Sequence, residues 1–164
     1  MLSLSKLNSL EPDLAKENFH RCCGSYVWAE RMTNLRPFES VTDLFVKADA
    51  VWFSLKKQDF LEAYSHHPQI GDASALKANW TSQEQTGVSF ADENTLKALS
   101  QGNKEYFSKF GFVFLICATG KQASEMLESL QKRLQNDLET EIKNASLETS
   151  KITRIRLEKL LSES

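Results

Sequence analysis

"GFVFLICATG", residues 111–120, is the stretch that decides the fold class. Its continuous apolar run is rich in aromatic and β-branched residues, a pattern typical of a buried strand. However, no other segment of the sequence offers a partner strand, and the buried backbone groups of a lone strand would stay unpaired. We therefore expect an extended or irregular segment enclosed by helices, and we predict an all-α fold.

The residues before this segment show helical patterns. "SVTDLFVKADAVWFSLKK", residues 40–57, opens with Ser40 and Asp43 in the spacing of a capping box. Its apolar residues recur on one stripe with a period of 3.6: Leu44, Phe45, Ala48, Trp52 and Leu55. Upstream, "PDLAKENFHRCCG" predicts a helix with Pro12 in its first turn and Gly24 as its stop. A short helix follows, and we expect the two to pack as a hairpin.

The middle of the chain contains shorter helical pieces. "DFLEAYSH" predicts a helix that ends near His66, because Pro68 disfavours a helical backbone at the residue before it. In "TSQEQTG", Thr81 and Glu84 have capping-box spacing and Gly87 is expected to stop the helix.

The later residues predict longer helices. "DENTLKALSQGNKEYFSKF" is expected to be helical despite Gly102. From residue 121 to residue 161, apolar residues at helical spacing predict two long helices with a break near Asn136 or Ser146. The whole chain is thus expected to form one compact bundle of roughly eight helices, a single domain spanning residues 1–164.

Composition limits the classes of function. The 164 residues are 41% hydrophobic and 26% charged, as in a soluble globular domain, and their net charge of −2 does not favour nucleic acid as a partner. No apolar run approaches the roughly 20 residues of a membrane span, and the N-terminus lacks a signal-peptide pattern. We expect a cytoplasmic protein with reduced cysteines, Cys22, Cys23 and Cys117. No His/Cys cluster has zinc spacing, so no metal site is predicted.

Three places could carry chemistry, and each also has a purely structural explanation. His67 follows a helix end and precedes a proline, so a rigid imidazole could exchange protons at neutral pH; spacing alone favours a contact with the last helical carbonyls. Glu84 could be only a helix cap, and Gln85 could be only a solvated side chain. Arg154 and Arg156 differ by about 200° around a helix, so at most one points inward.

Taken together, the motifs are more specific than any one of them. Eight fragments occur in order along nearly the whole chain: "NFHRCCGSYVWAERM", "RPFES", "ADAVWFSL", "AYSHHPQIGD", "WTSQEQTG", "NKEYFSKFGFVFLICATGK", "LQKRLQND" and "KITRIRL". In these fragments the chain resembles the family of 2-oxo-4-hydroxy-4-carboxy-5-ureidoimidazoline (OHCU) decarboxylases. These enzymes complete the conversion of urate to allantoin.

The resemblance implies a cofactor-free, all-helical carboxy-lyase that acts on a small ureidoimidazoline carboxylate, releases (S)-allantoin and forms a homodimer. The histidine of the "HPxIG" motif, His67, would be the catalytic acid or base, with Glu84 as its partner. The substrate-binding residues implied by the family motifs are Pro68, Thr81, Gln85, Phe114, Leu115, Ile116, Cys117, Ala118 and Arg156. Of the two arginines near the C-terminus, Arg154 is the less favoured choice.

Two alternatives remain open on the sequence. A helical binding module could keep this scaffold without the chemistry, although His67, Glu84, Gln85 and Arg156 are all present. A decarboxylase or isomerase of a related ureido compound would look the same, because about 1 to 3 kcal/mol of pocket contacts changes a substrate preference. The chain ends "LLSES" instead of the peroxisomal Ser-Lys-Leu type of signal found in many relatives, which favours the cytoplasm.

Overall fold

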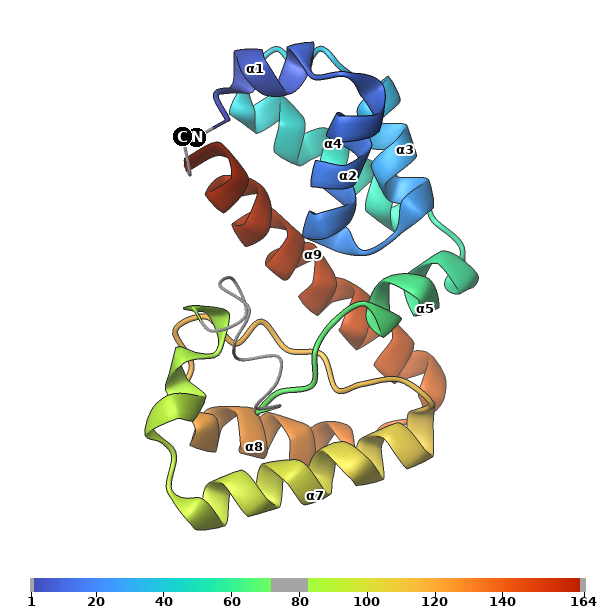
Figure 1. The fold of residues 1–164 in the computed structure, drawn as a ribbon. Helices are drawn as coiled ribbons and strands as arrows, with labels where there is room; N and C mark the ends of the chain where they lie inside the picture. Colours follow the sequence, from blue (N-terminus) through green and yellow to red (C-terminus); the bar gives the residue numbers. More distant parts are fainter. Residues whose placement is uncertain (1, 72–82, 163–164) are drawn as a thin grey trace. The chain divides into compact units, whose positions relative to one another are not determined.

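The computed structural model describes residues 2–71 and 83–162, and within these ranges a long extended segment joins α7 (Glu93–Phe110) to α8 (Ala123–Arg133), whereas most other helices follow one another closely (Figure 1). Eight α-helices and one 3₁₀ helix, η2, have both ends in these ranges, Gln83 and Glu84 are also α-helical, and no strand occurs there, so the predicted all-α class is confirmed. In chain order they are α1 (Leu4–Ser9), α2 (Pro12–Cys23), α3 (Tyr26–Asn34), α4 (Val41–Phe53), α5 (Lys57–Ser65), η2 (Thr86–Phe90), α7 (Glu93–Phe110), α8 (Ala123–Arg133) and α9 (Leu138–Ser162).

The contacts divide the chain into two compact units. Unit 1 comprises Met1–Ala63 and Thr149–Ser164, and unit 2 comprises Tyr64–Glu148. Helices α5 and α9 each contribute residues to both units. The single domain expected for residues 1–164 stays a prediction.

Unit 1 contains a hairpin of helices α2 and α3, whose ends are set by local signals. Helix α2 ends because Gly24 adopts a left-handed conformation, with φ +88°, and its N–H donates to the His20 carbonyl at 2.8 Å. The Ser25 hydroxyl then accepts from the Trp28 N–H at 3.1 Å and starts α3. Helices α2 and α3 pack against each other, which confirms the predicted hairpin.

Helix α4 starts as predicted, with one difference at its cap. The Ser40 hydroxyl accepts from the Asp43 N–H at 3.0 Å, but the Asp43 carboxylate accepts from the N–H of Glu39, one residue before the expected partner. The apolar stripe faces the core of unit 1, where the Trp28 indole N–H donates to the Ala48 carbonyl at 3.0 Å and joins α3 to α4. The buried face of α4 therefore follows the helical period of the sequence.

The helix boundaries in unit 2 also follow the sequence. Helix α5 ends at Ser65, three residues before Pro68. Helix α7 continues through Gly102 without interruption. The break between α8 and α9 falls at residues 134–137, which confirms the prediction near Asn136, whereas α9 continues through Ser146.

The expected helix stop at Gly87 is wrong. Gln83 and Glu84 are α-helical, but Gly87 lies inside the 3₁₀ helix η2. Its φ is not positive; the glycine is needed for space, because a Cβ there would overlap the backbone carbonyl of Lys121. Thr81, the other half of the proposed capping box, lies outside the described residues.

Residues 111–120 contain no helix and no strand, as expected for an extended segment enclosed by helices. Helices α7 and α8 lie side by side in unit 2 (Figure 1). The Tyr106 ring of α7 contacts the rings of Phe112 and Phe114 edge-on, with centroids 5.7 and 5.4 Å apart. These aromatic contacts anchor the extended segment in the core of unit 2.

All three cysteines lie within the described residues; they are buried and form no disulfide. Burial raises the pKa of the Cys23 thiol to about 12, so this thiol stays protonated and unreactive at neutral pH.

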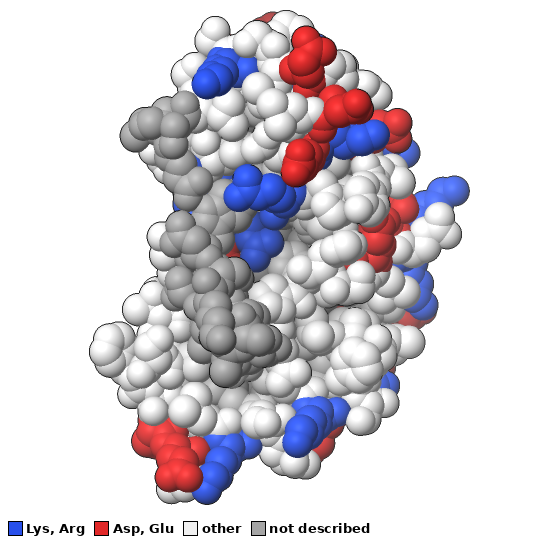
Figure 2. Space-filling model, viewed as in Figure 1, with Lys and Arg blue, Asp and Glu red and all other residues white. Residues whose placement is uncertain are grey.

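Acidic and basic side chains are interspersed on the face drawn in Figure 2, in line with the nearly balanced composition. None of the described helices has the length and apolar character needed to cross a membrane.

Candidate active site

His67 is the second residue after the end of α5 and is buried, with 6% of its surface exposed, whereas the adjacent His66 is exposed. The His67 backbone N–H donates to the Tyr64 carbonyl at 3.2 Å, which extends the helix end by one turn. Pro68 then fixes the backbone dihedral that follows. The sequence-based expectation of a rigid mount therefore has a physical basis: a backbone hydrogen bond before the imidazole and a proline after it.

The segment that carries His67 is linked to the two residues proposed from the "EQ" motif. The Gly71 N–H donates to Gln85 Oε1 at 2.8 Å. Glu84 and Gln85 are both buried, and Gln85 is only 3% exposed. This hydrogen bond joins Gly71, four residues after His67, to Gln85 in unit 2, although the two sequence motifs are more than ten residues apart.

A further residue of this region was missed by the sequence analysis. The Asn103 side-chain amide, on α7, donates to the Ile70 carbonyl at 3.1 Å. Asn103 lies on the buried stripe of α7 with Leu99, Tyr106 and Phe110. A polar residue on an otherwise apolar stripe was the signal that could have identified it, because a buried amide needs a hydrogen-bond partner.

The predicted backbone segment, residues 114–118, is buried and held by two cations. Arg133 Nη1 donates to the Leu115 carbonyl at 2.5 Å, and Lys121 Nζ donates to the Cys117 carbonyl at 2.9 Å. In a trans peptide the C=O and the following N–H point in opposite directions. The N–H groups of Ile116 and Ala118 therefore point away from the two cations, and two residues apart in an extended segment they lie on the same side.

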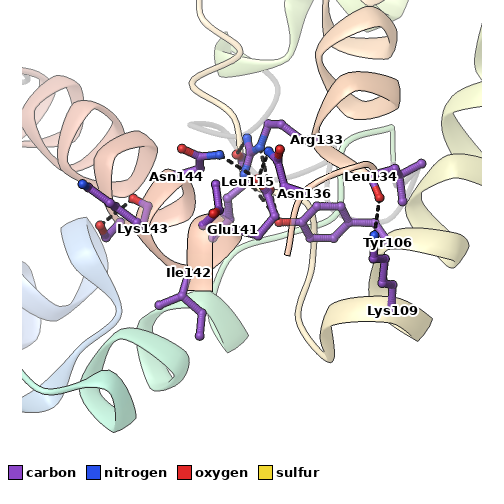
Figure 3. A network of polar contacts seen from close by, with 12 residues as sticks. Tyr106, Lys109, Leu115, Arg133, Leu134, Asn136, Glu141, Ile142, Lys143 and Asn144 are labelled. Carbon is purple, nitrogen blue, oxygen red and sulfur yellow. Dashed lines mark hydrogen bonds and ion pairs between the residues drawn. The ribbon is translucent and has the colours of Figure 1, made fainter. Parts of the chain in front are cut away.

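A buried polar network fixes Arg133 (Figure 3). The Glu141 carboxylate accepts from Arg133 Nε at 2.7 Å and from the Tyr106 hydroxyl at 2.6 Å. Its other oxygen accepts from the amides of Asn136 and Asn144 at 2.9 and 2.7 Å. Four donors thus satisfy one carboxylate, as a buried charge requires.

The ionisation of this network follows from its contacts. Burial by itself raises the pKa of Glu141. The hydrogen bonds from Tyr106 and Asn136 and the charge of Arg133 together lower this pKa by more than burial raises it, so the net shift is downward. Burial, and then the hydrogen bond to Glu141, raise the pKa of the Tyr106 hydroxyl, which remains a donor. The network is a structural support for Leu115 and was not predicted from the sequence.

The two C-terminal arginines differ as expected for residues on opposite sides of a helix. Arg156 is buried in unit 1. Arg154 is exposed, interacts with Glu158 at 3.5 Å and lies over the Phe45 ring, 4.5 Å from its centroid. The expectation that at most one of the two points inward is confirmed, and Arg156 is the inward residue. Its role as a substrate ligand stays a prediction.

One hollow of unit 2 contains none of the predicted site residues. It lies beside η2 and the start of α8, and it is lined by Gly87, Phe90, Ala91, Asp92, Thr95, Gln122, Ala123 and Ser124. We assign no role to it.

Comparisons with known proteins agree with the sequence motifs. The family model described as OHCU decarboxylase matches residues 8–158. The uric acid degradation bifunctional protein TTL of Arabidopsis thaliana is 34% identical over 158 residues, which cover 92% of this chain and 48% of that protein. The chain spans half or less of the length of such bifunctional relatives.

Shorter relatives match over nearly their whole length. The 2-oxo-4-hydroxy-4-carboxy-5-ureidoimidazoline decarboxylase of Xenopus laevis is 26% identical over 95% of this chain and 93% of its own length. A crystal structure of OHCU decarboxylase in the presence of (S)-allantoin superimposes with a TM-score of 0.80 at 34% identity, covering 93% of this chain and 99% of that one. The chain therefore belongs to the OHCU decarboxylase family.

Proposed function

We propose that this protein catalyses the cofactor-independent decarboxylation of 2-oxo-4-hydroxy-4-carboxy-5-ureidoimidazoline to (S)-allantoin, the last step of urate degradation. The observation that carries the proposal is the hydrogen bond from Gly71 N–H to Gln85 Oε1, which joins the His67 segment to the Glu84–Gln85 pair. Family membership supplies the reaction, and the crystal structure of a relative obtained with (S)-allantoin supports the product.

The chemistry needs no external electron sink. The substrate carries its carboxylate on a carbon that also bears a hydroxyl and adjoins a ring C=N bond. When the bond to the carboxylate breaks, CO₂ leaves, its electron pair forms a C=C bond to the adjacent ring carbon, and the C=N electron pair moves onto the ring nitrogen, which takes up a proton. The hydroxyl then loses its proton and becomes a ring carbonyl, while a proton is delivered to one face of the adjacent carbon, which bears the ureido group, so that one enantiomer forms. The protein has to orient the substrate and supply a proton at the right place.

The roles of the site residues follow from their chemistry. His67 exchanges the proton, and Glu84 orients its imidazole. Gln85 Oε1 already accepts from Gly71, so its side-chain N–H groups are the part of Gln85 that serves the substrate. Thr81, Pro68 and Arg156 are proposed as further substrate contacts on the basis of the family motifs.

The extended segment is proposed to bind the polar oxygens of the ring and ureido groups. The carbonyls of Leu115 and Cys117 are engaged by Arg133 and Lys121, so the outward N–H groups of Ile116 and Ala118 are the suitable donors. Buried N–H groups that point at an oxygen carrying developing negative charge stabilise it strongly. We place Phe114 in this segment as a wall of the same site.

The experiment generates the unstable substrate in place from urate, with urate oxidase and a hydroxyisourate hydrolase, and follows the circular dichroism of allantoin after this protein is added. We expect rapid appearance of one enantiomer. His67→Ala should keep the far-ultraviolet helical signal and lower turnover by about 10² or more. His66→Ala, a change at the adjacent exposed histidine, is the matched control and should retain turnover.

Two outcomes would end the proposal. Allantoin forming at the uncatalysed rate and as a racemate in the presence of the wild-type protein would favour a binding module instead. Equal turnover by the wild-type protein and a folded His67→Ala variant would remove the imidazole from the reaction.

The assembly and compartment belong to the same proposal. The family resemblance supports a homodimer, which sedimentation of the purified protein would reveal as a doubling of the monomer mass of 18.6 kDa. A cytoplasmic location stays a prediction from the sequence.

A further inference from the structure

One peptide bond in the His67 segment is held at both of its polar groups. The carbonyl of Ile70 accepts from the Asn103 amide at 3.1 Å, and the N–H of the same peptide, that of Gly71, donates to Gln85 Oε1 at 2.8 Å. Asn103 comes from α7, whereas Gln85 directly precedes η2. Two side-chain amides from separate elements thus fix the plane of the Ile70–Gly71 peptide.

These two hydrogen bonds, which we call the grip on the Ile70–Gly71 peptide, lie close in sequence to His67, the proposed proton donor. Only Pro68 and Gln69 separate His67 from Ile70, and the other end of the segment is held by the hydrogen bond from His67 N–H to the Tyr64 carbonyl. Proline restricts the backbone between the two anchors. The orientation of the peptide at Ile70 therefore limits the positions that the His67 backbone can adopt.

Asn103 is an unusual choice for a core position. Its side chain is 2% exposed, and its Oδ1 is buried without a hydrogen-bond partner among the described residues. A buried acceptor without a hydrogen-bond partner costs free energy, and an apolar residue at the same position of α7 would avoid this cost. The donor function of Asn103 toward Ile70 is the contact that an apolar residue would lose.

We infer that Asn103 is a positioning residue, which holds His67 in its reactive orientation by gripping the Ile70–Gly71 peptide together with Gln85. This inference rests on the proposed decarboxylase function. Asn103 acts through the backbone and is not itself a group that exchanges a proton. Loss of its N–H donor should therefore slow the chemical step more than it weakens substrate binding.

The test uses Asn103→Leu, which removes the donor, and Asn103→Asp, which replaces the amide by a carboxyl of the same shape. We expect Asn103→Leu to lower kcat by about 10-fold or more, since a displaced catalytic group is costly, with KM changed by less than about threefold. In the Asn103→Asp variant, an ionised carboxylate would repel the Ile70 carbonyl, whereas the protonated carboxyl would donate to it. The ratio of variant to wild-type kcat should therefore rise as the pH falls for Asn103→Asp, and stay flat for Asn103→Leu.

A matched control makes the same chemical change elsewhere on the same helix. Asn94→Asp lies in the exposed first turn of α7 and should leave kcat and its pH dependence unchanged. Hydrogen exchange of the Gly71 amide, which is engaged in the grip, supplies a readout independent of turnover. We expect it to speed up about 10-fold or more in a folded Asn103 variant while exchange in the helices of unit 1 is unaltered.

The results separate this inference from the proposed function. A wild-type protein without turnover would refute the function, and Gly71 exchange would then still test the grip. Unchanged kcat in a folded Asn103→Leu protein would overturn the inference. So would identical pH dependence of the Leu and Asp variants, because a residue that only fills the core would respond in that way.

Discussion

Gly87 lies against the backbone of Lys121 so closely that a Cβ on Gly87 would overlap the Lys121 carbonyl oxygen. This contact joins η2, which directly follows Gln85, to the turn after the extended segment. The obstacle is backbone and not a flexible side chain, so a rotamer change cannot relieve it. A glycine at position 87 is therefore needed for η2 to lie this close to the backbone of Lys121.

Gly87→Ala should lower the free energy of unfolding by about 1 to 3 kcal/mol, the usual cost of forcing an extra carbon into a packed position. Urea unfolding followed by circular dichroism measures this. Ser89→Ala, an exposed position in the same 3₁₀ helix, should change the stability little. A Gly87→Ala protein as stable as the wild type would show that η2 and the backbone at Lys121 can separate at no cost in free energy.

Gly102 allows α7 and α8 to approach, since a Cβ there would lie 2.6 Å from Leu130 Cδ2, on a fully buried side chain. Gly102→Ala should be destabilising by up to about 2 kcal/mol, because a steric cost of about 1 to 3 kcal/mol exceeds the gain of about 1 kcal/mol in helix propensity. In a Leu130→Ala background the same change should cost less, since the smaller residue leaves room. Additive effects in this double-mutant cycle would contradict the packing explanation.

Glu141→Gln removes the charge at the centre of the network that holds Arg133. At neutral pH we expect the free energy of unfolding to fall by about 1 to 3 kcal/mol, as for a broken set of charged hydrogen bonds. The exposed change Glu128→Gln on α8 is the control, with little measurable effect expected.

The effect of Glu141 should depend on pH with a definite sign. The folded protein lowers the pKa of this carboxyl, because the hydrogen bonds and the Arg133 charge outweigh the effect of burial. Such a group adds stability above its unfolded pKa, about 4.3, and this stability is lost as the pH falls through the folded pKa. The stability difference between wild type and Glu141→Gln should therefore narrow on acidification, in urea titrations from pH 7 to pH 3. A difference that widens would refute the assignment.

The two C-terminal arginines offer a matched pair. Arg156→Gln should lower kcat/KM by about 10- to 100-fold, the range for loss of a charged hydrogen bond to substrate. Arg154→Gln, at an exposed position two residues away, should remain within about twofold of the wild type. Steady-state kinetics with substrate generated in place measures both. If Arg154→Gln were the slower variant, the assignment of the inward arginine as a substrate ligand would be reversed.

Local sequence signals predicted the helices well because the physical causes are themselves local. Ser40 caps α4, Gly24 ends α2, and Pro68 limits α5, each through contacts within a few residues. The extended segment was assigned correctly for a different reason: the sequence contained no second strand with which it could pair. The expected helix stop at Gly87 was wrong because a glycine is needed there to leave room for the carbonyl of Lys121, more than thirty positions away in the sequence.

The candidate site divides in the same way. The family resemblance proposed His67, Glu84, Gln85 and Arg156, for which spacing alone left a structural explanation open, and the burial of each agrees with a role inside the protein. Neither identified Asn103 or the Arg133 contact with Leu115, because these join residues 33 and 18 positions apart. Residue type alone does not reveal such partners.

The sequence by itself determined the family, the all-α class and most helix boundaries of this protein, since capping groups, proline, most glycines and apolar periodicity act over a few residues. Only the tertiary structure decided which backbone groups near His67 and in residues 114–118 are held by side chains. The reason is physical: a buried peptide group takes its partner from whatever packing brings within about 3 Å, and that neighbour comes from any part of the chain.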